Sequence, residues 1–276
     1  MKFLFVLLIA VSAGLHSDLA IARKSDLRSD RIQISYVPPK TPAHETVFQL
    51  LKERKVLERF KEFLSPLRLP RTLRLKLAGC DGDSNAWYDD DAITVCYEYV
   101  DDLLKNAPKE VTPAGVTRMD AIVGPTLEVF LHEVGHAVFD YLSVPVFGRE
   151  EDAADQFAAY LLLKFAKDDA RRLIVGVAYA YHAEASVPST KKNPLADEHG
   201  LPAQRFYNVL CTAYGADPKL FGDLVDKGYL PKERAEGCDD EYEQITRAMT
   251  RLIWPYVDPT RAKQVRAKRW LRFYPE

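Results

Sequence analysis

The chain has 276 residues, of which 47% are hydrophobic and 28% charged, a composition typical of a soluble globular protein with one large domain or two small ones. Its formal net charge at pH 7 is −2, so it lacks the positive excess of nucleic-acid-binding proteins. We therefore expect no nucleic-acid partner.

The first 22 residues differ from the rest of the chain. Lys2 precedes an apolar run from Phe3 to Ala13, and Ala20-Ile21-Ala22 forms a small-x-small cleavage site. This apolar run is too short to span a bilayer, which takes about 20 residues. We predict a signal peptide over residues 1–22, export to the periplasm or the outside of the cell, and a mature chain (23–276) without a transmembrane segment.

The N-terminal half of the mature chain carries strand patterns around one long helix pattern. Alternation of apolar and polar residues predicts four strands, over residues 31–37, 72–77, 85–88 and 92–97, the last two joined by the acidic turn 89–91. Apolar residues at helical spacing predict one helix over residues 44–64, which ends before Pro66.

From residue 97 onward the pattern is almost entirely helical. Helices are predicted near 101–105 and over 125–142, 150–167, 169–184, 203–214 and 240–253. The one long irregular stretch is 185–202, and long loops in compact enzymes often form sites. We predict a single α+β domain, predominantly helical, with an N-terminal α/β part (about 30–145) and a helical C-terminal part (about 146–276).

Four cysteines lie in the mature chain, namely Cys80, Cys96, Cys211 and Cys238. An even number in an exported chain predicts two disulfides, and the local pairing, Cys80 with Cys96 and Cys211 with Cys238, is the simplest of the three connectivities. A metal site built from cysteine is the alternative, but the chain has no CxxC motif.

Residues 132 to 136 read His-Glu-Val-Gly-His within the predicted helix 125–142. Side chains four apart lie on one face of a helix, so His132 and His136 can bind one metal ion while Glu133 lies beside it. This arrangement is typical of zinc peptidases, in which the glutamate acts as general base on a metal-activated water. The alternative is a pair of hydrogen-bonded core histidines.

A catalytic zinc ion takes three protein ligands and one open position. The metzincin pattern is excluded, because its third histidine would stand at Leu142. The candidates for the third ligand are Glu150, Glu151, Asp152, His182 and His199.

Helix spacing favours Glu151 among these candidates. Asp155 follows Glu151 at plus four, where a carboxylate can accept the outer N–H of a ligating histidine. Ala154 and Ala158 give a small-residue face that allows close approach to the HExxH helix. We therefore predict Glu151 as ligand and Asp155 as the carboxylate that orients a ligating histidine; the alternative is that the acidic residues 150–155 only stabilise a helix N-terminus.

HExxH followed by ExxAD (Glu151 to Asp155) resembles the gluzincin metallopeptidases, in particular the CAAX prenyl protease-like branch, which implies one zinc ion bound by His132, His136 and Glu151. The segment HGLPAQR (199–205) is similar in His-to-Arg spacing to that branch's HP-containing motif, with Gly200 in place of the proline.

Most of the mature chain is similar to a bacterial family of exported metallopeptidases, formerly a domain of unknown function. The segments that resemble its recurring motifs are CDGDSNAWYDDDAITVCYE, HEVGHAVFD, GREEDAADQFAA and DEHGLPAQRFYN. The resemblance implies a zincin-like fold of the gluzincin type, in which a small N-terminal sheet packs on the HExxH helix.

Peptide hydrolysis also needs a hydrogen-bond donor that stabilises the negative charge developing on the carbonyl oxygen. His199 in the long loop is the first candidate and Arg205 the second, and the sequence also allows Tyr181 or Tyr207. Each of these residues also has a purely structural interpretation.

Two further segments carry expectations about partners. Asn85-Ala86-Trp87-Tyr88 resembles the edge strand with which thermolysin-type enzymes bind peptides, which implies substrate binding at Asn85 and Ala86; the alternative is an aromatic strand packed on the core. A basic run near the C-terminus is either a solvated helix face or a weak contact for an anionic surface. This run comprises Arg261, Lys263, Arg266, Lys268, Arg269 and Arg272.

Three functions follow from these features. The leading one is an exported zinc metallopeptidase that acts on peptides or proteins. The alternatives are a non-catalytic, metal-stabilised binding or scaffold protein of the same fold, and a helical structural protein without metal. The general-base position of Glu133 favours the first, because metal binding alone does not require it.

Overall fold

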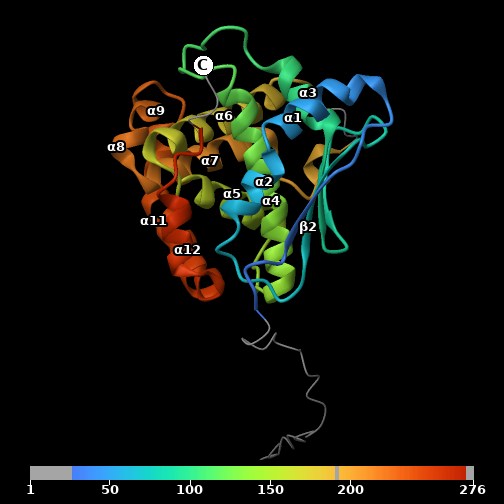
Figure 1. The fold of residues 1–276 in the computed structure, drawn as a ribbon. Helices are drawn as coiled ribbons and strands as arrows, with labels where there is room; N and C mark the ends of the chain where they lie inside the picture. Colours follow the sequence, from blue (N-terminus) through green and yellow to red (C-terminus); the bar gives the residue numbers. More distant parts are fainter. Residues whose placement is uncertain (1–26, 190–192, 272–276) are drawn as a thin grey trace, which may run out of the picture.

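A computed structural model of the chain describes residues 27–189 and 193–271 (Figure 1). The predicted signal peptide and Arg272 lie outside the described residues. The strands are β1 (Ile32–Tyr36), β2 (Leu73–Ala78), β3 (Ala86–Asp89) and β4 (Ala92–Cys96). The α-helices are α1 (Glu45–Glu53), α2 (Val56–Phe63), α3 (Tyr97–Asn106), α4 (Asp120–Leu142), α5 (Glu150–Leu162), α6 (Lys167–Ala185), α7 (Pro202–Ala216), α8 (Pro218–Phe221), α9 (Asp223–Asp226), α10 (Lys232–Ala235), α11 (Cys238–Ala248) and α12 (Pro259–Arg266).

The four strands form one sheet in the order β1-β2-β4-β3. β1, β2 and β4 run parallel, and β3 pairs antiparallel with β4, which leaves β3 at an edge. Leu73, Leu75 and Leu77 of β2 are fully buried while Arg74 is exposed, so the alternation in the sequence orients one face of this strand toward the core. The predicted small N-terminal sheet and the mostly helical remainder are confirmed.

The helix predicted over residues 44–64 is instead two helices, α1 and α2. The chain breaks at Lys55, whose φ of +52° lies in the left-handed region. α1 buries Phe48 and Leu51, and a continuous helix would bring Lys55 and Glu58 onto that same face. The break lets α2 bury Val56, Leu57 and Phe60 instead.

The helix that carries HExxH, α4, lies at the centre of the molecule. Figure 1 shows it between the sheet and the C-terminal helices, and 16 of its 23 residues are buried. It begins five residues before the predicted start at Pro125, because Thr117 and Asp120 cap its first turn with reciprocal hydrogen bonds from backbone N–H to side-chain oxygen, both 3.1 Å. Other elements cover α4 on most sides, so it has no single buried face.

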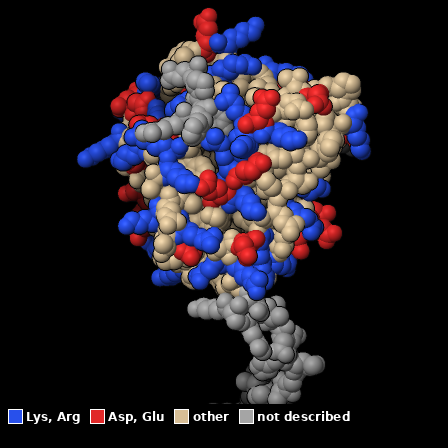
Figure 2. Space-filling model, in the orientation of Figure 1, with Lys and Arg blue, Asp and Glu red and all other residues tan. Residues whose placement is uncertain are grey.

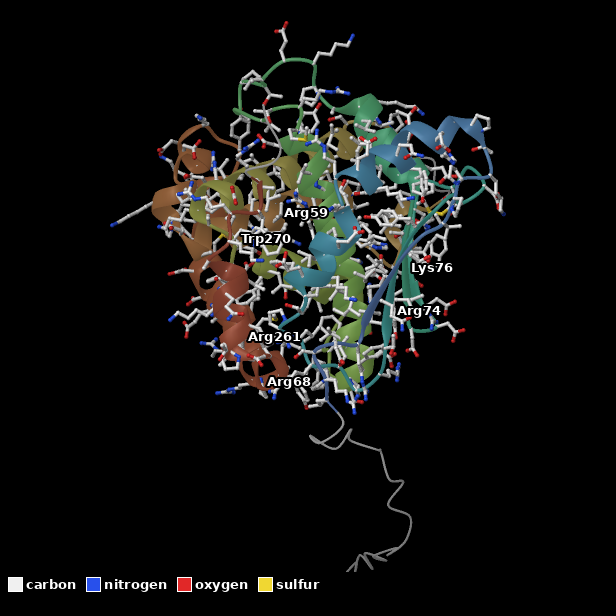
Figure 3. All side chains as sticks on the ribbon, in the orientation of Figure 1. Arg59, Arg68, Arg74, Lys76, Arg261 and Trp270 are labelled. Atoms are coloured by element: carbon white, nitrogen blue, oxygen red, sulfur yellow. A yellow bond between two sulfur atoms is a disulfide. The ribbon has the colours of Figure 1, made fainter. Side chains whose placement is uncertain are left out.

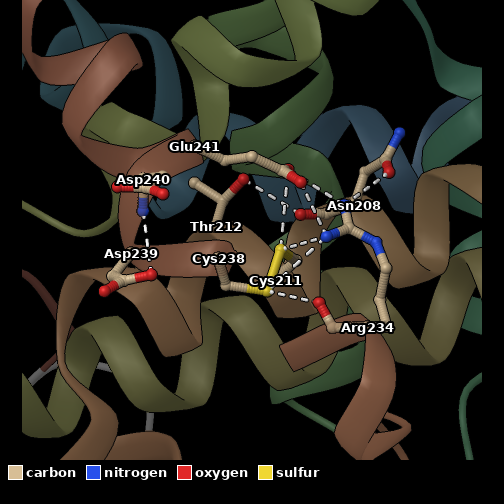
Figure 4. Close-up of a disulfide and its surroundings, with 8 residues drawn as sticks. All are labelled: Asn208, Cys211, Thr212, Arg234, Cys238, Asp239, Asp240 and Glu241. Atoms are coloured by element: carbon tan, nitrogen blue, oxygen red, sulfur yellow. Dashed lines mark hydrogen bonds and ion pairs between the residues drawn. A yellow bond between two sulfur atoms is a disulfide. The ribbon is translucent and has the colours of Figure 1, made fainter. Parts of the chain in front are cut away.

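Both predicted disulfides are present. Cys80–Cys96 joins the segment after β2 to the end of β4, and Cys211–Cys238 joins α7 to the start of α11. Around the second disulfide, Arg234 donates to the Sγ of Cys211 at 2.7 Å and pairs with Glu241 (Figure 4). Among the described residues, no helix combines the length and apolar character needed to cross a membrane.

Candidate metal centre

His132, Glu133 and His136 lie in the middle of α4. His132 is 3% exposed and Glu133 7%, because α4 is the central helix of the fold. His132 and His136 are one turn apart, and their Nε2 atoms lie 3.1 Å from each other. The pair thus directs two ring nitrogens at one point, as the sequence predicts.

Glu151 reaches the same point from the first turn of α5. Its Oε2 lies 2.9 Å from His132 Nε2 and 3.4 Å from His136 Nε2. The close approach of the two helices depends on Gly135, where a Cβ atom would lie only 3.3 Å from the Cα of Ala154. The small-residue contact expected from Ala154 is therefore present.

The three candidate ligand atoms match the dimensions of a tetrahedral zinc site. Bonds of about 2.0–2.1 Å at tetrahedral angles hold ligand atoms about 3.3 Å apart. The distances among His132 Nε2, His136 Nε2 and Glu151 Oε2 are 2.9, 3.1 and 3.4 Å. The residues present therefore fit a zinc ion.

Each histidine meets a carboxylate through its outer nitrogen. His132 Nδ1 lies 2.8 Å from Asp155 Oδ1, and His136 Nδ1 lies 2.8 Å from Glu150 Oε1. Such contacts fix the tautomer that leaves Nε2 facing inward for a metal. Asp155 lies where the helix spacing places it, whereas Glu150, a ligand candidate in the sequence, was missed as a partner of His136 because the sequence argument considered only the carboxylate at plus four from the ligand.

A second buried layer supports Asp155. Arg205 on α7 donates from Nε (2.7 Å) and Nη2 (2.6 Å) to its two oxygens. Glu128, also missed in the sequence, lies 3.8 Å from Arg205 Nη2 and accepts a hydrogen bond from the hydroxyl of Tyr181 at 2.7 Å. Burial raises the pKa of Asp155, but the hydrogen bonds and charges of His132 and Arg205 outweigh it and lower that pKa to about 2.

His199 reaches the centre from the segment between α6 and α7. Its Nε2 lies 2.8 Å from Glu151 Oε2, and its ring stacks on that of His132 with centroids 5.6 Å apart. The side chain is 40% exposed, so it faces solvent as well as the ligands.

The other candidates from the sequence lie elsewhere. His182 is exposed and packs against Phe206, and Asp152 pairs with Arg149. Tyr207 is 39% exposed, and its ring packs against Phe206.

The electrostatics of the centre favour a cation. Burial lowers the pKa of His132, but hydrogen bonds with Asp155 and Glu151 outweigh it and raise that pKa to about 10. Burial raises the pKa of Glu133, with its neighbouring histidines acting in the opposite direction. No described side chain hydrogen-bonds the Glu133 carboxylate.

The edge strand β3 contacts α4, the helix that carries His132 and His136. The hydroxyl of Tyr88 donates to Asp140, one turn beyond His136, at 2.6 Å. Ala86 is the first residue of β3 and Asn85 precedes it, with the carbonyl of Asn85 accepting from the N–H of Cys96 at 3.0 Å. A hydrogen bond therefore links the sheet edge to the helix that carries the two histidines.

A family model described as "Putative metallopeptidase" matches residues 36–253, which is most of the chain. The chain belongs to this family. No curated protein and no solved structure matches it. The matched range includes all three candidate zinc ligands of this metallopeptidase family member, together with Glu133 and the surrounding carboxylates.

Proposed function

We propose that this family member is an exported zinc peptidase of the gluzincin type, with a zincin-like fold. In this proposal His132, His136 and Glu151 bind one zinc ion, and Glu133 is the general base. The observation that carries it is the convergence of three ligand atoms within 2.9–3.4 Å of one another. The two disulfides support export, since disulfides persist in oxidising compartments.

Zinc, when bound, would supply a Lewis acid that polarises the scissile carbonyl and lowers the pKa of water. Glu133 would accept the proton of the attacking water and return it to the leaving amine. Its burial suits this role, because a carboxylate with a raised pKa is a stronger base. Substrate enters this scheme as a peptide or protein chain.

His199 is the proposed donor to the carbonyl oxygen, because its Nε2 reaches Glu151 while the side chain stays partly exposed. Arg205 was the second candidate in the sequence. Its Nε and Nη2 both point at Asp155, so we assign it a positioning role: it holds Asp155, which in turn orients His132.

The edge strand β3 is the proposed binding site for an extended peptide. It pairs with β4 on one side and ends the sheet on the other, so a substrate strand can add through backbone hydrogen bonds near Asn85 and Ala86. Its contact with Asp140 of α4 keeps that edge at a constant position relative to the ligand helix.

The test is Glu133→Gln in the purified mature protein. We expect peptide hydrolysis to fall by about 10²–10⁴-fold, with zinc content unchanged by elemental analysis. Glu110→Gln, at an exposed position, is the matched control and should keep full activity.

Two outcomes would contradict the proposal. Full activity of Glu133→Gln would exclude it as the base. Zinc bound by the wild type without hydrolysis of a peptide library would favour the metal-stabilised scaffold instead. Glu151→Ala should deplete the zinc, and unchanged stoichiometry would point to another ligand.

A further inference from the structure

The last part of the described chain is strongly basic. Residues 247–271 contain seven basic residues and one acidic residue, Asp258, whereas the whole chain has a formal net charge of −2. This segment therefore has a net charge of +6, and the remainder of the chain is acidic. It includes a single-turn helix, η5 (Trp254–Tyr256), and the whole of α12. Such a separation of charge favours an anionic partner at this part of the molecule.

Three of these cations are exposed and unpaired. Arg261 and Lys263 on α12, and Arg269 beyond its end, have no described side chain as a partner. The carboxylate of Asp258 accepts from the backbone N–H groups of Thr260 and Arg261, both at 2.9 Å, so it caps α12 and neutralises none of the three side chains. Their charge is therefore available to a partner.

The loop before β2 extends the same surface. The backbone N–H and the Nη2 of Arg68 donate to the carbonyls of Tyr256 and Pro255, both at 2.8 Å, and a carbonyl leaves the charge of the guanidinium in place. Figure 2 shows Lys and Arg side chains spread over this side of the molecule, and Figure 3 places Arg68 close to Arg261. Arg261 and Lys263 are two positions apart on a helix, so they point in different directions. The cations thus suit an extended anionic surface better than one small anion.

Amphipathic aromatic side chains lie among these cations. Trp254, Tyr256 and Trp270 are each half-buried. The indole N–H of Trp270 donates to the carbonyl of Val265 at 3.1 Å, and the guanidinium of Arg266 lies 5.7 Å from the centre of the Trp254 ring. Trp and Tyr are enriched where proteins meet the head groups of a membrane, because each ring has an apolar body and a polar edge.

We propose that this surface, the basic face made of Arg261, Lys263, Arg269, Trp254 and Trp270, docks on a membrane that contains anionic phospholipids. The cations match the phosphate charges of the lipids, and the indoles match the level of the head groups. Duplex nucleic acid or an acidic protein would match the charge alone. None of these residues belongs to the candidate metal centre, so the docking does not depend on the proposed peptidase activity.

Cosedimentation with vesicles tests the electrostatic part. The full mature chain should bind vesicles of phosphatidylcholine and phosphatidylglycerol at about 0.1 M salt, and binding should weaken by about tenfold or more at about 1 M salt, where the Debye length falls to about 3 Å. Each Lys or Arg near an anionic surface strengthens binding by about fivefold. The triple variant Arg261→Gln, Lys263→Gln, Arg269→Gln should therefore bind at least about tenfold more weakly.

The matched control is the triple variant Lys109→Gln, Lys219→Gln, Lys232→Gln. These lysines are exposed, have no described side-chain partner and lie outside the basic face, so this variant should bind within about twofold of wild type. Absence of binding to the anionic vesicles, equal binding to vesicles of pure phosphatidylcholine, or the same loss in both triple variants overturns the proposal.

Fluorescence quenching tests the position of the aromatic side chains. Vesicles whose phospholipids carry bromine in the acyl chains should quench the emission of Trp254 and Trp270. Trp87→Phe, on the edge strand, should keep this quenching, whereas the double variant Trp254→Phe, Trp270→Phe should lose most of it. Equal quenching in the two variants would overturn the proposal. The Trp87→Phe measurement needs no charge variant, so it decides the question even if the triple variant fails to fold.

Other polyanions separate a membrane from other anionic partners. Duplex DNA and polyglutamate should bind more weakly than the vesicles at equal concentration of negative charge, because they offer no head-group layer to the indoles. Tighter binding of either polymer, lost in the Arg261→Gln, Lys263→Gln, Arg269→Gln variant, would assign the basic face to nucleic acid or to an acidic protein and overturn the membrane proposal.

Discussion

Replacement of Asp155 by Asn is expected to weaken zinc binding and to destabilise the metal-free protein together. The Asp155 carboxylate accepts one contact from His132 Nδ1 (2.8 Å) and two from Arg205 (2.7 and 2.6 Å). An asparagine keeps one acceptor oxygen and directs an N–H group at its former donors. It therefore cannot keep all three contacts, and it loses the negative charge that His132 and Arg205 share at Oδ1.

The magnitudes follow from these contacts. Loss of an outer-shell partner of a ligating histidine costs about 10–100-fold in metal affinity. Breaking a fully buried ion pair costs about 3–5 kcal/mol. The side chains of Arg205 and Asp155 are 16% and 19% exposed, so water screens this ion pair in part. We therefore expect Asp155→Asn to lower the unfolding free energy by about 2–3 kcal/mol.

Two measurements separate the effects. Competition with a chromophoric chelator gives the zinc dissociation constant, and urea denaturation of the metal-free protein gives the stability. The double variant Asp155→Asn, Arg205→Met removes the unpaired charge, so it should regain part of the stability but none of the zinc affinity. Zinc affinity within about threefold of wild type in Asp155→Asn would refute the reasoning, because an outer-shell partner should contribute at least about tenfold.

The remaining predictions concern stability, packing and metal linkage. Glu98→Gln should lower the unfolding free energy by about 1–3 kcal/mol near neutral pH. Burial raises the pKa of Glu98, but hydrogen bonds from backbone N–H groups, including those of Gly82 and Cys80, outweigh burial and lower that pKa. The stabilisation by Glu98 is therefore present above the unfolded pKa of about 4.3 and is lost as the pH falls through the folded pKa. Urea denaturation should thus give a difference from wild type that shrinks in acid, and a constant difference would contradict this. Gly135→Val should cost about 1–3 kcal/mol and weaken zinc binding, since it separates α4 from α5; a normal thermal midpoint and zinc affinity would count against that packing. Zinc at about 100 times its dissociation constant should raise the unfolding free energy by about 2.7 kcal/mol in the wild type and not in His136→Ala, and an equal gain in both would place the metal elsewhere.

Local patterns in the sequence were enough to predict the types of secondary structure and part of the candidate metal centre. The alternation in β2 reports which face of that strand is buried, and HExxH places two histidines one turn apart in any helix. The local disulfide pairing followed from cysteine number and spacing. The break at Lys55 was missed because it depends on how α1 and α2 pack against their neighbours.

Only the tertiary structure could bring together groups that are far apart in the chain. Asp155 follows Glu151 by one turn, so the sequence could suggest its role. The contacts from Arg205 to Asp155, from Glu128 to Arg205 and from Tyr181 to Glu128 depend on the packing of α4, α6 and α7. The sequence by itself determined which residue types could bind a metal, because helical periodicity is a local property of the backbone. The packing of the helices decided which of these residues lie close together. Distances between side chains of different elements depend on burial and on close approach of the helices, such as that of Gly135 to Ala154.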